Sequence, residues 1–310
     1  MSMKKKIIHY RRTKESDLLA AMQVIARSFD DLRKRNGMKP FKRKITEPDP
    51  VMVHLQKSDP ESTFVATDAK GKIIGYTQSQ VRENEWYLAF LFVEPAYQSE
   101  GVGGKLLTRA MKCGTENQCQ RRALCTFAYN PQAVALYSKH GMTPQRAILV
   151  MTRKNDLKKN QRRTVSKSNL KFEVTKNVRL INKFSRLDRK ARGVARPEEH
   201  FLWMDSNDAI VLAFHADKKL VGYSVIFKRG FIGPVAATNS TYLRQILEMS
   251  IDFGIRQRHE DQFLFAFGEN SEIVSYLLNQ GFRIAETDLL MATEMVGNPA
   301  LYVPAHLALY

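Results

Sequence analysis

Two segments of this chain resemble each other at a constant separation, and this repeat restricts the folds that the chain can adopt. The sequence NPQAVALYSKHGM at residues 130–142 matches NSEIVSYLLNQGF at residues 270–282, an offset of 140 residues. A Gly-Tyr pair at 75–76 recurs at 222–223. Because 310 residues can form two domains that each bury a hydrophobic core, the repeat predicts two copies of one fold.

The charge distribution divides the chain near its middle. The net charge is +18, and residues 1–170 hold 32 Lys+Arg against 15 Asp+Glu, a balance of +17. Residues 171–310 hold 17 and 16, a balance of +1. Basic runs of this kind attract polyanions or an anionic cofactor, or they form solvated loops without a dedicated partner.

The basic run at residues 153–171 contains hardly an apolar residue, which is typical of a linker between domains. We therefore predict one domain at 1–155, a basic linker at 156–170 and a second domain at 171–310. The apolar runs are too short to cross a membrane, and the N-terminus lacks the apolar segment of a secretory signal. A cytoplasmic location without membrane contact is the expectation.

The three cysteines, Cys113, Cys119 and Cys125, match neither a disulfide framework nor a common zinc spacing. We predict reduced thiols and no metal site.

Hydrophobic periodicity predicts alternating strands and helices in the first copy. A central strand, apolar on both faces, precedes a glycine-rich loop and a helix. The predicted strands span 6–12, 85–95, 123–129 and 148–154, the predicted hairpin spans 62–83, and the predicted helices span 15–37, 105–113 and 131–140.

The loop YQSEGVGGKLL, residues 97–107, places Gly101, Gly103 and Gly104 where a strand passes into a helix. Glycine is costly at such a position unless the backbone must turn or approach a ligand closely. Free N–H groups and the helix dipole make this place an anion site. The Rossmann and P-loop patterns do not fit the spacing.

The segment FVEPAYQSEGVGGKLL resembles motif A of the GNAT (Gcn5-related N-acetyltransferase) superfamily, Gln/Arg-x-x-Gly-x-Gly/Ala, through Gln98, Gly101 and Gly103. The segment at 130–142 resembles motif B, and the likeness covers residues 7–153. The resemblance implies an α/β (α+β) protein of two GNAT-like domains, each a mixed, mostly antiparallel central sheet flanked by helices. It also implies transfer of an acetyl group from acetyl-coenzyme A to an amine by direct attack in a ternary complex.

By the same resemblance, one loop and one strand would hold the coenzyme. The loop amides would bind its pyrophosphate, and the central strand would splay at a bulge where the pantetheine arm pairs with the backbone. An asparagine before the motif B helix would contact the pantetheine or order the loop. The implied cofactor residues are Leu91, Phe92, Val93, Gln98, Ser99, Glu100, Gly101, Val102, Gly103, Gly104, Lys105 and Asn130.

Tyr137 is the candidate catalytic acid, because the equivalent tyrosine of the family protonates the departing thiolate. The alternative is an ordinary core tyrosine on an amphipathic helix. For the general base we consider Glu85, with Glu83 as the competitor. Regular strand alternation would place Glu85 on one face with residues 87, 89, 91 and 93.

The second copy lacks these features. The 140-residue offset places Thr238, Ser240, Thr241, Leu243 and Arg244 at the loop positions of the first copy, and Leu277 opposite Tyr137. Side chains at the loop would crowd a pyrophosphate, and the acid is missing. We therefore predict a degenerate copy that shapes the substrate site or stabilises the first copy.

The amine acceptor, a small molecule or a protein amine, does not follow from the fold. Two other functions compete with acetyl transfer. One is a tandem GNAT that uses a larger acyl donor. The other is an RNA- or ribosome-binding module in which the basic first half is functional and the acyl site is vestigial.

Overall fold

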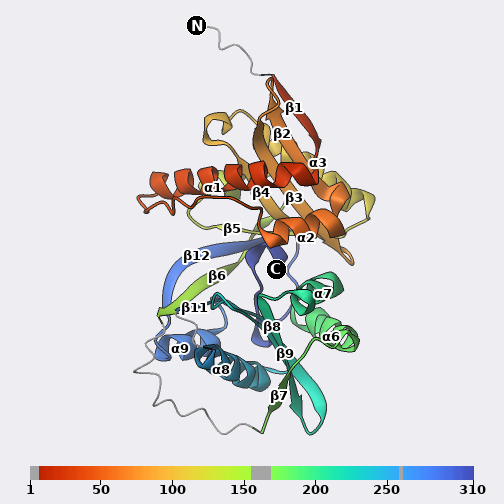
Figure 1. Ribbon diagram of the computed structural model, residues 1–310, viewed down its shortest axis with the longest axis vertical. Helices are drawn as coiled ribbons and strands as arrows, with labels where there is room; N and C mark the ends of the chain where they lie inside the picture. The colour runs from red at the N-terminus through yellow and green to blue at the C-terminus, as the bar shows by residue number, and fades with distance from the viewer. Residues whose placement is uncertain (1–6, 155–168, 258–260) are drawn as a thin grey trace. The chain divides into compact units, whose positions relative to one another are not determined.

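The computed structural model describes residues 7–154, 169–257 and 261–310 (Figure 1). Its contacts divide the chain into an N-terminal unit, residues 1–125 and 129–143, and a C-terminal unit, residues 126–128 and 144–310. The predicted linker at 156–170 lies outside the described residues except for 169 and 170. The domain boundaries drawn from the sequence therefore remain a prediction.

The N-terminal unit is built on a sheet in the order β1-β2-β3-β4-β5. Its strands pair antiparallel, except that β4 and β5 run parallel. The strands are β1 (Ile8–Arg12), β2 (Thr63–Asp68), β3 (Ile73–Arg82), β4 (Glu85–Val93) and β5 (Arg121–Phe127), and the helices are α1 (Leu18–Arg35), α2 (Pro50–Ser58), α3 (Val102–Glu116) and α4 (Pro131–Ser138).

Helix α2 was not predicted from the sequence, although the sequence carries a signal for it. Asp49 accepts a hydrogen bond from the backbone N–H of Val51, and Pro50 occupies the first helical position. Both features are typical of a helix start.

Helices cover both faces of this sheet (Figure 1). Apolar side chains of α1 and α2, including Val24 and Met52, pack with Tyr76 of β3 in one buried cluster. Val102 and Leu106 of α3 pack with Val93 in a second cluster. Gly75 allows the close approach of α3, since a Cβ there would lie 2.9 Å from Leu106 Cδ1.

A β-bulge interrupts β4 at Ala89. Gln78 pairs with Phe90 and Ser79 pairs with Leu88, so Ala89 is an extra residue on β4. The bulge reverses which face the following side chains occupy. The expected common face is therefore wrong beyond the bulge: residues 91 and 93 lie on the opposite face from residues 85 and 87, because strand alternation is broken at Ala89.

The C-terminal unit repeats the succession of strands and helices of the first copy. A five-stranded sheet has the order β13-β10-β9-β8-β7, and outside it β12, β6 and β11 are hydrogen-bonded neighbours in that order. The strands are β6 (Thr143–Lys154), β7 (Lys171–Val174), β8 (Ala209–Ala216), β9 (Lys219–Phe227), β10 (Ile232–Ala237), β11 (Asp261–Phe267), β12 (Arg283–Ala292) and β13 (Tyr302–Val303), and the helices are α6 (Ile181–Ala191), α7 (Pro197–Asp205), α8 (Ser240–Arg256) and α9 (Ser271–Asn279).

Strand β6 closes the first copy in the sequence, yet its residues from 144 onward belong to the C-terminal unit. It pairs antiparallel with β11, from Asp261 opposite Lys154 to Phe267 opposite Ile148. The backbone hydrogen bonds of β6 are thus made with strands of the C-terminal unit, and this explains why contacts place it there.

A buried polar network lies inside the C-terminal unit. Asp188 is fully buried, accepts a 2.5 Å hydrogen bond from Tyr223 and lies 2.6 Å from Nε2 of His200. Arg196 is also buried, with Nε 3.5 Å from the same carboxylate. Burial alone would raise the pKa of Asp188, but Arg196 and His200 hold it below its usual value.

Candidate functional site

The glycine loop leads from β4 into α3 with two residues in the left-handed backbone region. Ser99 has a φ of 62° and Gly101 a φ of 79°, and only glycine adopts the second without strain. Gly101 is the N-cap of α3 and makes no side-chain capping hydrogen bond. The first helical bond runs from Lys105 N to Gly101 O, 3.2 Å. The three amides before it have no partner within the helix and form a partial positive charge.

Gly103 and Gly104 leave the backbone of the first helical turn uncovered. A Cβ at position 103 would lie 3.7 Å from Val93 and 3.9 Å from Leu136, and one at position 104 would lie 3.9 Å from Leu136. These are ordinary contacts, so packing within the described protein does not require glycine here. The backbone surface fits an anionic group that must approach the amides closely. The same distances bring the end of β4, the loop and α4 together.

Gln98 holds the loop in place. Its side-chain amide donates to the backbone oxygen of Val93 at 3.0 Å and to Ser28 Oγ at 3.3 Å. Its oxygen accepts a 3.0 Å hydrogen bond from Arg35. The first residue of motif A therefore ties the loop to β4 and to α1, a contact that the motif alone did not reveal.

Strands β4 and β5 separate beside the loop. Their parallel register runs from Glu85 opposite Arg121 to Leu88 opposite Leu124 and ends there within the described residues. Beyond that point, residues 91–93 of β4 are paired with β3. One backbone edge of these three residues is thus left without a neighbouring strand among the described pairings, as the resemblance implies for the pantetheine arm.

Tyr137 lies on the last turn of α4 and is 6% exposed. Burial raises the pKa of Tyr137, so the phenol keeps its proton throughout the neutral range. Asn130 caps the helix, because its side-chain oxygen accepts a 3.3 Å hydrogen bond from the N–H of Ala133. Leu136, which precedes Tyr137 in the chain, faces the glycine turn: a Cβ added at Gly103 or Gly104 would lie 3.9 Å from its side chain.

Glu85 lies at the opposite end of β4 from the loop. Its carboxylate is buried and forms an ion pair with Arg121 at 3.5 Å. It precedes the bulge by four residues, roughly 13 Å along a strand, which exceeds the reach of a base acting directly or through one water. Glu83 lies farther still, in the turn before β4, with a φ of 52°.

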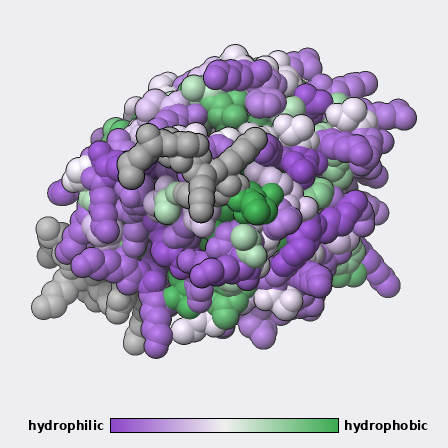
Figure 2. Space-filling view, turned by 90° about the horizontal axis from the view of Figure 1, so that it is seen from above, coloured by the Kyte–Doolittle hydropathy of each residue, from purple (hydrophilic) through white to green (hydrophobic). Residues whose placement is uncertain are grey.

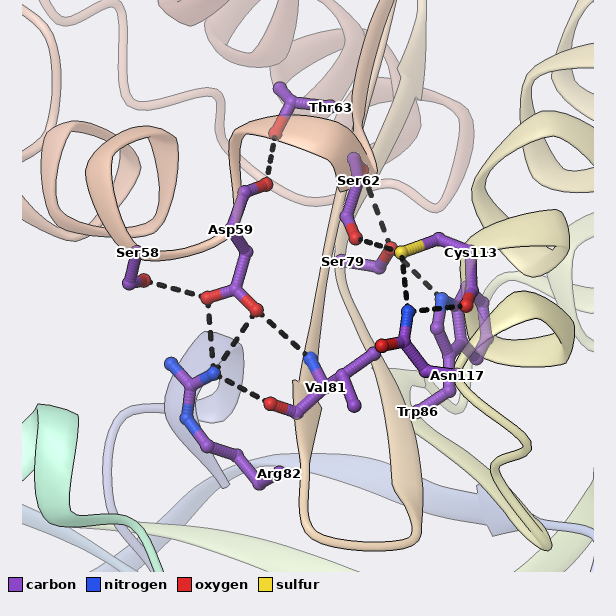
Figure 3. A network of polar contacts seen from close by, with 10 residues as sticks. All are labelled: Ser58, Asp59, Ser62, Thr63, Ser79, Val81, Arg82, Trp86, Cys113 and Asn117. Carbon is purple, nitrogen blue, oxygen red and sulfur yellow. Dashed lines mark hydrogen bonds and ion pairs between the residues drawn. The ribbon is translucent and has the colours of Figure 1, made fainter.

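A polar network surrounds the same end of the sheet (Figure 3). Asp59 accepts hydrogen bonds from the N–H of Val81 at 3.0 Å and from Arg82, which lies opposite Glu85 in the sheet. Trp86 donates to Ser79 Oγ at 2.9 Å. The structure therefore gives Glu85 a place among buried structural ion pairs and does not bring it to the glycine loop.

Sequence reasoning also missed a row of buried polar side chains on β3. Tyr76, Gln78 and Gln80 share one face of the strand, and the two glutamines flank the bulge of β4. Within the described part of the chain, the Tyr76 hydroxyl and the side-chain oxygens of both glutamines are buried without a hydrogen-bond partner. The alternation in YTQSQ was the available signal, since polar residues are unusual in a buried strand.

The corresponding loop of the second copy is filled. Asn239 caps α8 by accepting a 2.8 Å hydrogen bond from the N–H of Tyr242. The guanidinium carbon of Arg244 lies 3.4 Å from the centre of the Tyr276 ring. Leu277, at the position of Tyr137, is completely buried.

No group of three His, Cys, Asp or Glu residues with metal-binding geometry occurs among the described residues. No helix in the described ranges has the length and apolar character to span a membrane. The three cysteines are free thiols. The face drawn in Figure 2 is mostly hydrophilic, with apolar residues in small groups.

Residues 29–142 match the sequence model of the Acetyltransferase (GNAT) family. Over 97 residues the chain is 24% identical to a mycothiol acetyltransferase of Stackebrandtia nassauensis, covering 31% of this chain and 32% of that protein. Over 87 residues it is 33% identical to the uncharacterized N-acetyltransferase YhfO of Bacillus subtilis, covering 26% of this chain and 58% of that protein. The matched part is less than two thirds of the length of either relative.

Solved structures resemble the chain over nearly its full length. A candidate acetyltransferase from Pyrococcus horikoshii superposes with a TM-score of 0.76 at 15% identity, covering 98% of this chain and 96% of that one. A tandem GNAT protein from the clavulanic acid biosynthesis pathway superposes with a TM-score of 0.63 at 12% identity, covering 94% and 100%. At such identities the likeness concerns the fold alone, and it confirms the two-copy fold predicted from the repeat.

Proposed function

We propose that this tandem GNAT protein, whose N-terminal copy carries the matched acetyltransferase domain, transfers an acetyl group from acetyl-coenzyme A to an amine. The observation that carries the proposal is the uncovered backbone of Gly103 and Gly104 at an α3 N-terminus without a side-chain cap. An anion site of this kind, beside the free edge of β4 and the buried phenol of Tyr137, suits an acyl-coenzyme A.

Each part of the site has a task in this reaction. The amides of residues 102–104 bind the pyrophosphate, and the free edge of residues 91–93 orients the pantetheine arm. When bound, the coenzyme supplies an acetyl thioester. The amine nitrogen forms a bond to the acetyl carbon as the carbon–sulfur bond breaks, and Tyr137 gives its proton to the departing sulfur. The amine loses its own proton to a base that is not Glu85, given the ion pair and position of that residue.

Calorimetric titration of the purified chain with acetyl-coenzyme A tests the cofactor site. Gly103→Val places a branched side chain over the amides, and we expect at least tenfold weaker binding, because charge-assisted hydrogen bonds to the pyrophosphate are lost. Thr115→Val, which also introduces a valine but at an exposed position near the other end of α3, is the matched control and should bind normally. Equal affinity of both variants and the parent chain would remove the pyrophosphate role.

The acceptor requires a separate experiment. A panel of small amines and peptides, incubated with acetyl-coenzyme A, reports transfer through the release of free coenzyme thiol. We expect at least one amine to give release that Gly103→Val abolishes. If saturable binding occurs and no amine gives release, the same panel with longer acyl-coenzyme A donors decides between acetyl and larger acyl groups.

A further inference from the structure

A basic segment with an exposed aromatic ring covers the last residues of α1 and the start of the connection to α2 in the N-terminal unit. Residues 33–44, RKRNGMKPFKRK, contain seven Lys and Arg and no Asp or Glu. We call this segment the basic aromatic loop. Arg35 of this segment holds Gln98 of the glycine loop, and the other six cations take no part in the proposed acetyl transfer.

The loop has a defined conformation. The Asp30 carboxylate accepts hydrogen bonds from the backbone N–H of Phe41 at 2.8 Å and of Lys42 at 3.1 Å. Arg33 Nε donates to the backbone oxygen of Lys39 at 2.9 Å. The basic side chains are therefore presented from a fixed backbone, which lowers the ordering cost when a partner binds.

Phe41 is 49% exposed, and two guanidinium groups lie within cation–π distance of its ring. The guanidinium carbon of Arg33 is 4.3 Å from the ring centre, and that of Arg43 is 5.1 Å away. The ring also stacks on Phe29, with centres 5.5 Å apart and an interplanar angle of 27°. An aromatic ring that is held in this way and still half exposed offers a planar surface for stacking.

The cations around this ring remain available. The carboxylate of Asp30 is engaged with backbone amides, and Asp31 pairs with Arg35 at 2.9 Å. The remaining basic side chains are exposed and form no side-chain hydrogen bond or ion pair within the described residues; they are Lys34, Lys39, Lys42, Arg43 and Lys44. Five unneutralised charges in the segment that carries this exposed ring suit a partner with several regularly spaced negative charges.

We propose that the basic aromatic loop binds single-stranded nucleic acid, with phosphates on the lysines and a base stacked on Phe41. Proteins that bind single strands without sequence preference combine lysine contacts to the phosphates with an aromatic ring on which a base stacks. An acidic peptide would satisfy the charges and leave the exposed ring unused. A coenzyme carries too few phosphates to engage five cations. This function does not depend on the proposed acetyl transfer.

Binding of a fluorescently labelled 12-nucleotide RNA of uridines to the full chain tests the proposal. The triple variant Lys39→Gln, Lys42→Gln, Lys44→Gln removes three phosphate contacts. In single strands each contact contributes about 0.7 to the logarithmic salt slope, so the slope should fall by about 2 and affinity at 0.1 M salt by about 100-fold. Lys57→Gln, Lys70→Gln, Lys72→Gln changes three exposed lysines of the same unit and is the matched control.

A second variant tests the stacking surface. Phe41→Ala should weaken RNA binding by about tenfold or more with an unchanged salt slope, whereas Phe41→Trp should retain binding and show fluorescence quenching by the stacked base. Phe201→Ala, another exposed phenylalanine (53%), should bind normally. The proposal fails if both lysine triples weaken binding equally, if RNA does not bind at low salt, or if polyglutamate competes as well as RNA does.

Discussion

The two copies begin the same helix in two different ways. In the first copy, α3 starts at Gly101, which supplies no side-chain cap, and its first amides are left for a ligand. In the second copy, Asn239 supplies its own oxygen to the amide of Tyr242. A helix start whose N–H group already bonds a capping side chain has fewer free N–H groups to bind an anion. The identity of the capping residue therefore distinguishes the candidate binding loop of the first copy from the structural turn of the second.

The next turn shows the same contrast at matched positions. Position 104 is glycine and faces Leu136, since a Cβ added there would lie 3.9 Å from the Leu136 side chain. The residues 140 positions later are Arg244 and Tyr276. The guanidinium carbon of Arg244 lies 3.4 Å from the centre of the Tyr276 ring. The space that the first copy leaves over the backbone is occupied in the second copy by a stacked side chain.

The largest expected effect concerns the acid, Tyr137 against Leu277. Tyr137→Phe keeps the buried ring and removes the proton that the departing sulfur needs. We expect kcat to fall by about 10²–10⁴-fold with unchanged affinity for acetyl-coenzyme A. Steady-state kinetics and calorimetry on one preparation separate the two quantities. An unchanged kcat would leave Tyr137 as a core residue and remove this difference between the copies.

Transplanting the second copy's residue into the first tests whether filling the turn abolishes binding. The double variant Gly104→Arg, Leu136→Tyr recreates the stacked pair of the second copy. It should lower the affinity for acetyl-coenzyme A by about 100-fold, because the backbone amides lose about two charge-assisted hydrogen bonds to the pyrophosphate. The midpoint of thermal unfolding should stay close to that of the parent chain. Leu136→Tyr alone is the control. Retained binding in the double variant would show that the filled turn is not what silences the second copy.

Sequence pattern predicted the repeat, most of the elements and the loop, because these depend on local periodicity and on glycine positions. It could not predict the face on which residues beyond Ala89 lie, since a bulge depends on pairing between β3 and β4. The ion pair of Glu85 with Arg121 could not be predicted for the same reason, because only the pairing of β4 with β5 places these two residues opposite each other. The coenzyme and acid roles remain predictions, because they require a ligand in place.

A buried carboxyl distinguishes the closing strands of the two copies. Asp288 of β12 corresponds to the buried Ile148 of β6, and one oxygen of Asp288 has no partner within the described residues. Burial, together with the charge of Glu286, raises the pKa of Asp288 from 3.8 to about 7. Between these values the folded chain binds a proton that the unfolded chain has lost.

The stability contribution of this group is therefore complete below pH 4 and is lost as the pH rises through 7. We expect the free energy of unfolding to fall by about 2.5 kcal/mol between pH 5 and pH 8 on account of Asp288 alone. Asp288→Asn should remove that part of the slope, as measured by urea denaturation at several pH values. Parallel profiles for the parent and the variant would contradict the raised pKa.

The smallest effect compares two tyrosines at matched positions of the copies, Tyr76 on β3 and Tyr223 on β9. Both are completely buried. Tyr223 donates a 2.5 Å hydrogen bond to Asp188, whereas the Tyr76 hydroxyl has no partner among the described residues.

Tyr223→Phe should lower the free energy of unfolding by about 2 kcal/mol, because a buried carboxylate loses a donor. Tyr76→Phe removes an unsatisfied hydroxyl and should change stability by less than about 0.5 kcal/mol or increase it. Urea denaturation of both variants at pH 7 gives the comparison. Equal losses would mean that Tyr76 has a partner, such as a buried water beside Gln78, and that this face of β3 is a satisfied polar network.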